Sequence, residues 1–116
     1  MSGERKTGAR LLVDTLEANG VERVFIVPGE SYLAVIDALG DSPIDTVLAR
    51  QESGAAYMAD AAAKLTGKPG ICMVTRAPGA MNAAGGIHVA EHDSTPMIVF
   101  VGQIERAFRE RGAFQE

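Results

Sequence analysis

Four short apolar runs alternate with segments of helical periodicity, and this alternation strongly constrains how the 116-residue chain can fold. The predicted strands lie at 24–27, 45–49, 71–74 and 97–101, and the predicted helices at 7–19, 32–39, 53–66 and 78–91. Strands separated by helices pair in parallel through right-handed crossovers. Residues 24–27 are apolar at every position, which is typical of a strand buried on both faces. The pattern predicts an α/β protein: a doubly wound, flavodoxin-like parallel sheet with helices on both faces.

Size and charge limit the class of protein. A domain of this length buries roughly two-thirds of its unfolded surface, enough for a single core. The formal net charge of −4 argues against a nucleic-acid partner, because such surfaces are basic. No apolar run approaches the ~20 residues of a membrane span, and residues 1–10 lack the apolar centre of a signal peptide. We therefore expect a cytoplasmic protein that binds neither membrane nor nucleic acid, with its single cysteine, Cys72, acting as a small apolar residue.

Residues 103–116 differ in composition from the rest of the chain. They are rich in Arg and Glu, and no further apolar strand follows them. We expect one domain over residues 1–102 and a charged tail over residues 103–116 that leads into a missing remainder of the domain. On this interpretation the last elements of the sheet are incomplete.

Three segments should meet at the carboxyl edge of the sheet, where α/β folds bind ligands. They are residues 28–31, residues 51–52, and a loop predicted at residues 75–79. Glu52 and Glu30 would bring two carboxylates to this edge. On spacing alone, each acid can instead be a helix-start residue that the helix dipole stabilises, and Arg76 can be an exposed loop charge. Both interpretations stay open at this point.

Other patterns predict no additional site. The first strand is not followed by G-x-G-x-x-G, and the chain has no phosphate-binding P-loop. His88 and His92 have a spacing that can chelate a metal on a helix, but a surface or capping role suits them better because the usual Glu partner is missing. We expect no metal site.

A series of ordered motifs resembles one family. In chain order they are Val-Pro-Gly at 27–29, Arg-Gln-Glu-Ser-Gly-Ala-Ala at 50–56, Gly-Lys-Pro-Gly at 67–70, Pro-Gly-Ala-Met-Asn at 78–82, Asp-Ser-Thr-Pro-Met at 93–97, Gly-Gln at 102–103 and Ala-Phe-Gln-Glu at 113–116. From about residue 8 to residue 116, the chain resembles the N-terminal pyrimidine-binding domain of thiamine diphosphate enzymes of the acetolactate synthase type.

The resemblance implies a role for Glu52 in cofactor activation. A glutamate at this position hydrogen-bonds N1′ of the aminopyrimidine, and proton exchange there lets the 4′-imino nitrogen deprotonate the thiazolium carbon that attacks a 2-keto acid. The resemblance also implies that Gln115 reaches the reacting carbon or the substrate. The remaining cofactor-binding positions that it implies are Pro28, Gly29, Pro78, Gly79 and Asn82.

Several positions depart from the family pattern. Glu30 stands where a second Gly is usual, so the resemblance implies a possible substrate-side acid/base group there and puts plain acetolactate synthesis in doubt. Gln51 replaces a common His, Arg76 and Ala77 replace a common Ser-Gly, and Met81 replaces a common Thr. These residues should reshape the pocket entrance.

The resemblance also implies a larger enzyme. Family members carry two more domains, and the last of these binds Mg²⁺ and the cofactor diphosphate. We therefore expect the chain to be an inactive fragment that binds thiamine diphosphate weakly, and to form a homodimer or homotetramer in the complete enzyme. The substrate and the binding of FAD stay open. One alternative is a stand-alone binding or assembly module that pairs with a separate diphosphate-binding chain, and another is a remnant that only folds or dimerises.

Overall fold

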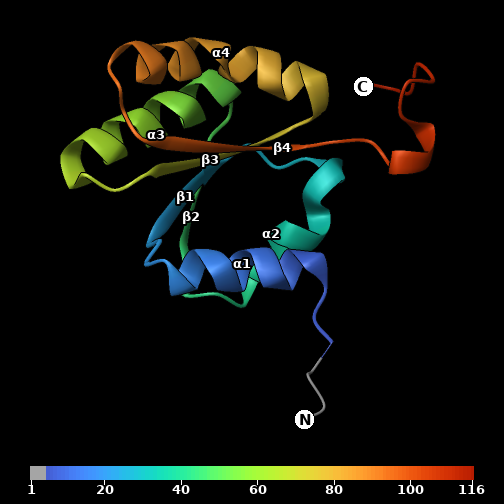
Figure 1. Ribbon diagram of the computed structural model, residues 1–116, viewed down its shortest axis with the longest axis horizontal. Helices are drawn as coiled ribbons and strands as arrows, with labels where there is room; N and C mark the ends of the chain where they lie inside the picture. The colour runs from blue at the N-terminus through green and yellow to red at the C-terminus, as the bar shows by residue number, and fades with distance from the viewer. Residues whose placement is uncertain (1–4) are drawn as a thin grey trace.

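A computed structural model describes residues 5–116, in which one parallel sheet lies between two layers of helices (Figure 1). The strands are β1 (Arg23–Ile26), β2 (Asp45–Leu48), β3 (Gly70–Thr75) and β4 (Met97–Gly102). The helices are α1 (Gly8–Ala18), α2 (Leu33–Gly40), α3 (Glu52–Thr66) and α4 (Arg76–His92), with short 3-10 turns at Glu30–Tyr32 and Arg106–Phe108. Residues 1–4, where the polar N-terminal segment starts, lie outside the described residues.

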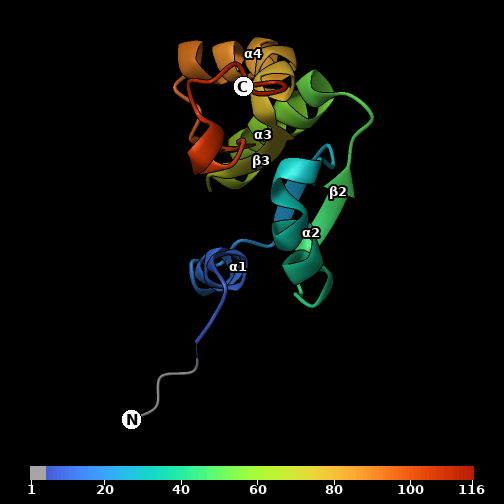
Figure 2. The ribbon, with the colours of Figure 1, turned by 90° about the vertical axis from the view of Figure 1, so that its right-hand side faces the viewer.

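The chain winds the sheet in two directions from β1. The strand order is β2-β1-β3-β4, and every neighbouring pair is parallel. Helices α1 and α2 cover one face, whereas α3 and α4 cover the other (Figure 1, and Figure 2 in a view turned by 90°). Because the chain returns past β1 after β2, β1 and β3 become neighbours at the point where the winding direction changes. The predicted doubly wound, flavodoxin-like α/β sheet is confirmed.

Each face of the sheet has its own apolar core. Ile26 and Met73 pack with α1 and α2 on one face, and Phe25, Cys72 and Val74 pack against alanines of α3 on the other. Burying an aliphatic side chain such as that of Ile26 contributes about 1.5–3 kcal/mol. Residues 24–26 are all buried, so the prediction of a strand buried on both faces is correct.

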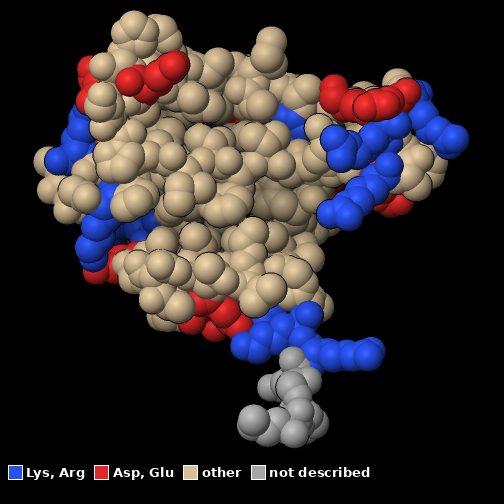
Figure 3. Space-filling view, viewed as in Figure 1, with Lys and Arg blue, Asp and Glu red and all other residues tan. Residues whose placement is uncertain are grey.

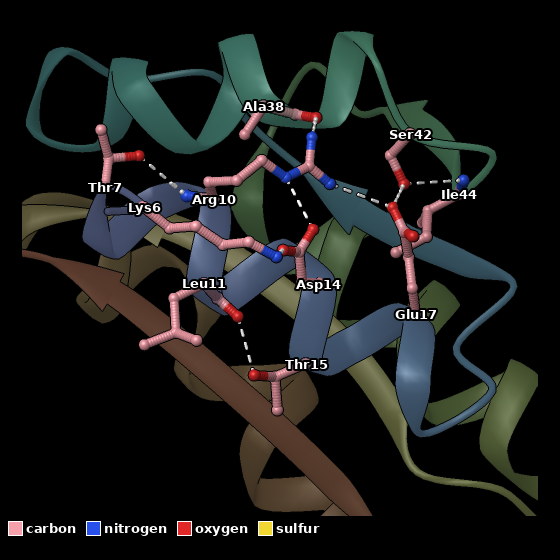
Figure 4. A network of polar contacts seen from close by, with 10 residues as sticks. All are labelled: Lys6, Thr7, Arg10, Leu11, Asp14, Thr15, Glu17, Ala38, Ser42 and Ile44. Carbon is pink, nitrogen blue, oxygen red and sulfur yellow. Dashed lines mark hydrogen bonds and ion pairs between the residues drawn. The ribbon is translucent and has the colours of Figure 1, made fainter. Parts of the chain in front are cut away.

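Arg10 ties α1 to the end of α2 (Figure 4). Its Nε donates to Asp14 Oδ1 at 2.7 Å, and its Nη1 donates to the carbonyl of Ala38 at 3.2 Å. Its Nη2 donates to Glu17 Oε1 at 3.2 Å, and the same oxygen accepts from Ser42 Oγ at 2.6 Å. One half-buried guanidinium therefore fixes α1 against both α2 and the turn that leads to β2.

The connection after β3 differs from the prediction. The loop expected at residues 75–79 is wrong, because β3 ends at Thr75 and α4 begins at the next residue, Arg76. Arg76 has a φ of 52°, so a single residue in the left-handed region makes the turn for which a loop was expected. Arg76 is consequently a half-buried helix residue and not an exposed loop charge. Pro78 lies in the first turn of α4, where its missing amide leaves no helix bond unmade.

Helices α3 and α4 approach closely because small residues face each other. A β-carbon placed on Gly86 of α4 would lie 2.5 Å from Ala56 Cβ and 2.8 Å from the Ala56 backbone carbon on α3. The neighbouring Gly85 faces outward, and a β-carbon there would meet only the side chain of the half-exposed Tyr57, whose hydroxyl would be nearest at 3.2 Å. Two adjacent glycines of one helix are therefore under different packing constraints.

These constraints predict opposite effects of the same substitution. Gly86→Ala should lower the free energy of unfolding by about 1–3 kcal/mol, because the backbone of α3 has to move away. Gly85→Ala should be neutral or raise it by up to about 1 kcal/mol through helix propensity, because the Tyr57 side chain can swing aside. Urea unfolding of both variants checks the pair, and equal effects would contradict the packing described here.

A buried carboxylate links α3 to the end of α4. Asp60 is 5% exposed, and its Oδ2 accepts a hydrogen bond from Lys64 Nζ at 2.8 Å. Lys64 also reaches Asp93, directly after α4, at 2.6 Å. The hydrogen bond from Lys64 holds the pKa of Asp60 below its usual value, although burial acts in the opposite direction.

This link should be lost in acid. A carboxyl group whose pKa is lowered by folding stabilises the protein above its unfolded pKa of about 3.9 and stops doing so as the pH falls through the folded value. Asp60→Asn should therefore lower the urea midpoint at pH 7, and the difference from the parent should shrink below about pH 4. Glu22→Gln removes the same charge from an exposed pair with Lys68 and should change little at either pH. A constant Asp60→Asn deficit across this range would contradict the assignment.

Residues 103–116 leave the carboxyl end of β4 and fold back toward the start of α4 (Figures 1 and 2). Charged side chains gather on this tail, whereas the surface over the edge strand β4 is almost free of charge in the same view (Figure 3). The division at residue 102 between domain and tail stays a prediction.

Candidate functional site

The carboxyl ends of β1 and β3 lie side by side where the winding direction changes. The amide of Val27 donates to the carbonyl of Met73 at 3.2 Å, which continues the β1–β3 pairing beyond the last residue of β1. Doubly wound folds bind their ligands in the crevice outside this point. The loop after β1 and the starts of α3 and α4 therefore surround the candidate site.

Glu52 is the first residue of α3. The helix begins there because Gln51 Oε1 accepts hydrogen bonds from the amides of Ser53 and Gly54, at 2.8 and 3.2 Å, and from the Ser53 hydroxyl. This cap satisfies amides that the helix leaves without partners, and the helix dipole favours a carboxylate at the same place. Glu52 is thus a helix-start acid and also lies at the ligand-binding edge of the sheet, so the two interpretations describe one geometry.

Asn82 of α4 holds one oxygen of this carboxylate. Its Nδ2 donates to Glu52 Oε2 at 3.1 Å. Gly79, one turn earlier on α4, is buried, and a β-carbon placed on it would lie 3.7 Å from Glu52 Oε1 and 3.3 Å from Val74 Cβ. The structure therefore brings three of the predicted site residues, Glu52, Gly79 and Asn82, into one group.

Two buried titratable groups respond to the charge of Glu52. Burial first, and then Cys72 and Glu52, raise the pKa of Tyr32 to about 12. Burial and then Glu52 raise the pKa of Cys72 to about 11. Cys72 stays a thiol at neutral pH, as expected for an unreactive core residue. Tyr32 stays protonated and donates to the carbonyls of Val27 and Met73, the latter at 3.3 Å, which holds the end of β1 against β3.

A pair of hydroxyl groups holds the loop after β1. Ser31 Oγ and Thr75 Oγ1 lie 2.7 Å apart, so one donates to the other. Gly29 passes so close that a β-carbon on it would lie 2.3 Å from Thr75 Cβ, which only glycine permits. Thr75 occupies the capping position of α4 but makes no side-chain cap. Its hydroxyl instead fixes the loop that contains Gly29.

The remaining predicted site residues lie around this group. Pro28 and Glu30 are exposed on the loop after β1, and Pro78 is exposed in the first turn of α4. Within residues 5–116 the Glu30 side chain has no hydrogen-bond or ion-pair partner. Gln115 is exposed, and its carbonyl accepts a hydrogen bond from the amide of Ala77 at 3.1 Å. The structure thus brings the backbone of Gln115 to the start of α4, the helix that contains Asn82.

Sequence reasoning missed two residues that shape the site and the capping role of a third. The Ser31–Thr75 pair joins residues 44 positions apart, which no local pattern indicates. No clear signal existed for the cap at Gln51, because glutamine is not among the residues that commonly cap helices. The Gln51 side chain contacts the amides of α3, and its effect on the pocket entrance stays a prediction.

A cavity of about 690 Å³ lies at the opposite edge of the sheet. It is bordered by the end of α1 and the starts of β3 and β4. Charged residues at its border pair with each other or with neighbours, as Glu22 does with Lys68 and Arg23 with Asp45. It lies far from the carboxyl edge, where doubly wound folds bind ligands, so we do not assign the site there.

Within the described residues, no three His, Cys, Asp or Glu side chains are grouped to hold a metal ion. His88 and His92 lie exposed on α4 with ring centroids 4.3 Å apart. No helix in residues 5–116 combines the length and apolar character needed to cross a bilayer.

Comparison with known proteins decides the family. The family described as "Thiamine pyrophosphate enzyme, N-terminal TPP binding domain" matches residues 6–116. The chain belongs to this family. The acetolactate synthase of Bacillus subtilis (strain 168) is 44% identical over 105 residues, which cover 90% of the chain and 18% of that protein. The resemblance inferred from the motifs is confirmed.

Two further relatives agree. The acetolactate synthase large subunit of Pyropia yezoensis is 42% identical over 115 residues, 96% of the chain and 20% of that protein. The probable acetolactate synthase large subunit of Methanocaldococcus jannaschii is 41% identical over 109 residues, 94% of the chain and 18% of that protein. The chain therefore spans about a fifth of the length of these relatives.

A double-mutant cycle tests the hydrogen bond between Ser31 and Thr75 in this thiamine pyrophosphate enzyme domain. Thr75→Val keeps the side-chain shape but removes the bond to Ser31, so it should lower the free energy of unfolding by about 1 kcal/mol. Ser31→Ala should cost a similar amount, and the double variant should cost about 0.5–1 kcal/mol less than the sum. Thr75→Ser is the matched control that keeps the hydroxyl. Strictly additive effects in urea unfolding would show that the pair does not interact.

Proposed function

We propose that this domain binds the aminopyrimidine ring of thiamine diphosphate in an enzyme that acts on 2-keto acids as a carboligase or decarboxylase. The observation that carries the proposal is the position of the Glu52 carboxylate. It begins α3 at the carboxyl edge of the sheet, and Asn82 holds one of its oxygens. The names of the relatives, all acetolactate synthases, support the reaction class.

The residues at this edge suit an aminopyrimidine. The nitrogen of such a ring pairs with a carboxylate, and Glu52 supplies one beside the start of α4. Gly79 is buried beside Glu52 Oε1, and the lack of a side chain there lets the carboxylate lie close to α4. Pro28 and Gly29 contribute an uncharged wall on the β1 side. The Glu52 carboxylate and the uncharged loop after β1 therefore fit the group.

Glu52 is the group in this chain that can exchange a proton with the ring. Thiamine diphosphate, when bound, supplies the thiazolium carbon that attacks the carbonyl of a 2-keto acid. A carboxylate can take and return a proton, whereas the amide of Asn82 cannot. Asn82 therefore orients the carboxylate without competing for the proton. Helix α3 fixes the position of Glu52 because Gln51 caps its first turn.

Residues on both sides of Glu52 would face the thiazolium and the substrate. We assign Pro28 and Gly29 to the ring wall and Pro78 to the pocket rim at the start of α4. Glu30 is exposed and unpaired within the described residues, so its carboxylate can serve as a substrate-side acid/base group. Gln115 lies at the start of α4 and would contact the substrate or the reacting carbon.

The complete enzyme would supply the rest of the site. We assign the diphosphate and its Mg²⁺ to another domain, in keeping with relatives about five times longer than this chain. A homodimer or homotetramer suits the outer face of α3 and α4, where Tyr57 and Met81 are exposed at 46% and 76%. FAD binding stays open, and a cytoplasmic location stays a prediction.

Glu52→Gln tests the central role. Glutamine keeps an oxygen that can accept from Asn82 but cannot exchange a proton, so the fold should survive. In the complete enzyme loaded with thiamine diphosphate and Mg²⁺, hydrogen–deuterium exchange at the thiazolium carbon should slow at least about 100-fold. Glu30→Gln is the matched control, and it should leave this exchange near the parent rate while changing turnover of 2-keto acids. Parent-like exchange in Glu52→Gln would refute the proposed function.

A further inference from the structure

Arg76 joins β3 to α4 in a conformation that its residue type rarely adopts. Its φ of 52° lies in the left-handed region, where a β-carbon crowds the backbone. No loop residue relieves the bend, because β3 ends at Thr75 and α4 begins at Arg76 itself. Such a residue persists only where neighbouring contacts hold it in place. The contacts around Arg76 therefore indicate which interactions stabilise this bend.

Two hydrogen bonds at this bend go to the C-terminal tail. Arg76 Nη1 donates to the carbonyl of Phe114 at 2.9 Å. The amide of Ala77 donates to the carbonyl of Gln115 at 3.1 Å. The amides in the first turn of a helix have no partner within the helix. Because the hydroxyl of Thr75 bonds Ser31 and makes no cap, the tail supplies the acceptor for α4.

The tail is folded so that it presents these carbonyls. The carboxylate of Glu116 accepts from the amides of Glu110 and Ala113, the latter at 3.3 Å. The amide of Glu116 donates to the carbonyl of Ala113 at 3.1 Å, and Gln115 has a φ of 62°. These bonds close residues 110–116 into a turn that lies beside the start of α4 (Figures 1 and 2).

The contact point is close to the carboxylate site. Ala77 precedes Asn82 by about 7.5 Å of rise along α4. Asn82 in turn donates to Glu52 Oε2 at 3.1 Å, and Gly79 lies between them on the same helix. Whatever fixes the tail at Ala77 therefore sets where the side chain of Gln115 starts, relative to the Glu52–Asn82 pair.

We propose that Arg76 is a positioning residue, which holds residues 113–116 across the start of α4 and thereby places Gln115 at the substrate side of the Glu52–Asn82 pocket. The reach of an arginine side chain is essential, because a short side chain at this position would not span the distance to the Phe114 carbonyl. The effect on a 2-keto acid substrate rests on the proposed function, whereas the contact between Arg76 and the tail does not.

Amide hydrogen exchange of the full chain tests the contact. Arg76→Met keeps an unbranched side chain, although a shorter one, and removes its donor, so the hydrogen-bonded amides of Ala77, Ala113 and Glu116 should exchange about tenfold faster. Arg76→Lys retains a donor and should restore part of the protection. Arg106→Met removes an exposed arginine of the same tail and should change nothing at Ala77. Arg76→Gly relieves the left-handed backbone, so it serves as a second variant without the side chain if Arg76→Met folds poorly.

The outcomes of this exchange experiment are distinct. Faster exchange in Arg76→Met and Arg76→Gly, but not in Arg106→Met, supports the contact. Unchanged exchange at Ala77 in both Arg76 variants overturns it, and so does an equal effect of Arg106→Met.

Kinetics of the complete enzyme test the placement of Gln115. With pyruvate as the probe substrate, Arg76→Met and Gln115→Ala should each raise KM about tenfold or more, while the Kd for thiamine diphosphate stays within about twofold. The double variant should be no worse than Gln115→Ala alone, because both changes act on one contact. An effect of Gln115→Ala without an effect of Arg76→Met would overturn the positioning role. If the parent enzyme neither binds thiamine diphosphate nor turns over a 2-keto acid, the proposed function fails, and the exchange experiment still decides the Arg76 contact.

Discussion

The direct junction between β3 and α4 is the constraint on which the candidate site depends. Because no loop separates β3, which ends at Thr75, from α4, which begins at Arg76, the strand and the helix are fixed relative to each other. Helix α4 therefore starts at the carboxyl edge of the sheet. The same two residues face in different directions. Thr75 bonds Ser31 on the loop after β1, and Arg76 bonds the carbonyl of Phe114 in the tail. Three segments far apart in the sequence therefore meet at one bend.

Close packing of α3 on α4 also fixes the distance between the side chains of Glu52 and Asn82. Gly86 leaves no room for a side chain against Ala56, so the two helices cannot separate or slide without opening a gap. One consequence is that Asn82 reaches Glu52 across the helix pair. At the opposite end of the pair, Lys64 joins Asp60 to Asp93, which ties the helices together where they leave the sheet. The orientation of the Glu52 carboxylate thus depends on the packing of the whole α3–α4 pair, and not only on the residues that contact Glu52.

The fold could be predicted from the sequence, whereas the site could be predicted only in part. Runs such as residues 71–74 and the glycine after α3, Gly67 with a φ of 70°, carry local signals for a buried strand and a helix end. The grouping of Glu52 with Asn82 followed from ordered motifs. The loop expected at residues 75–79 failed because propensity gives no warning that an arginine will adopt a left-handed conformation. The Ser31–Thr75 bond and the contact of Arg76 with the tail could not be predicted, because a contact between residues far apart in the sequence produces no periodic pattern.

The hydrogen bond between Ala77 and Gln115 has a thermodynamic consequence. It makes the order of the tail and the order of the first turn of α4 parts of one equilibrium. By linkage, anything that favours the docked tail strengthens the helix end beside Glu52, and anything that strengthens that helix end favours the docked tail by the same factor. A molecule that captured the tail in another conformation would release the amide of Ala77 and let this end of α4 fray. Under the proposed function, the docking of the tail would therefore change the fraction of molecules in which this helix end is ordered beside Glu52.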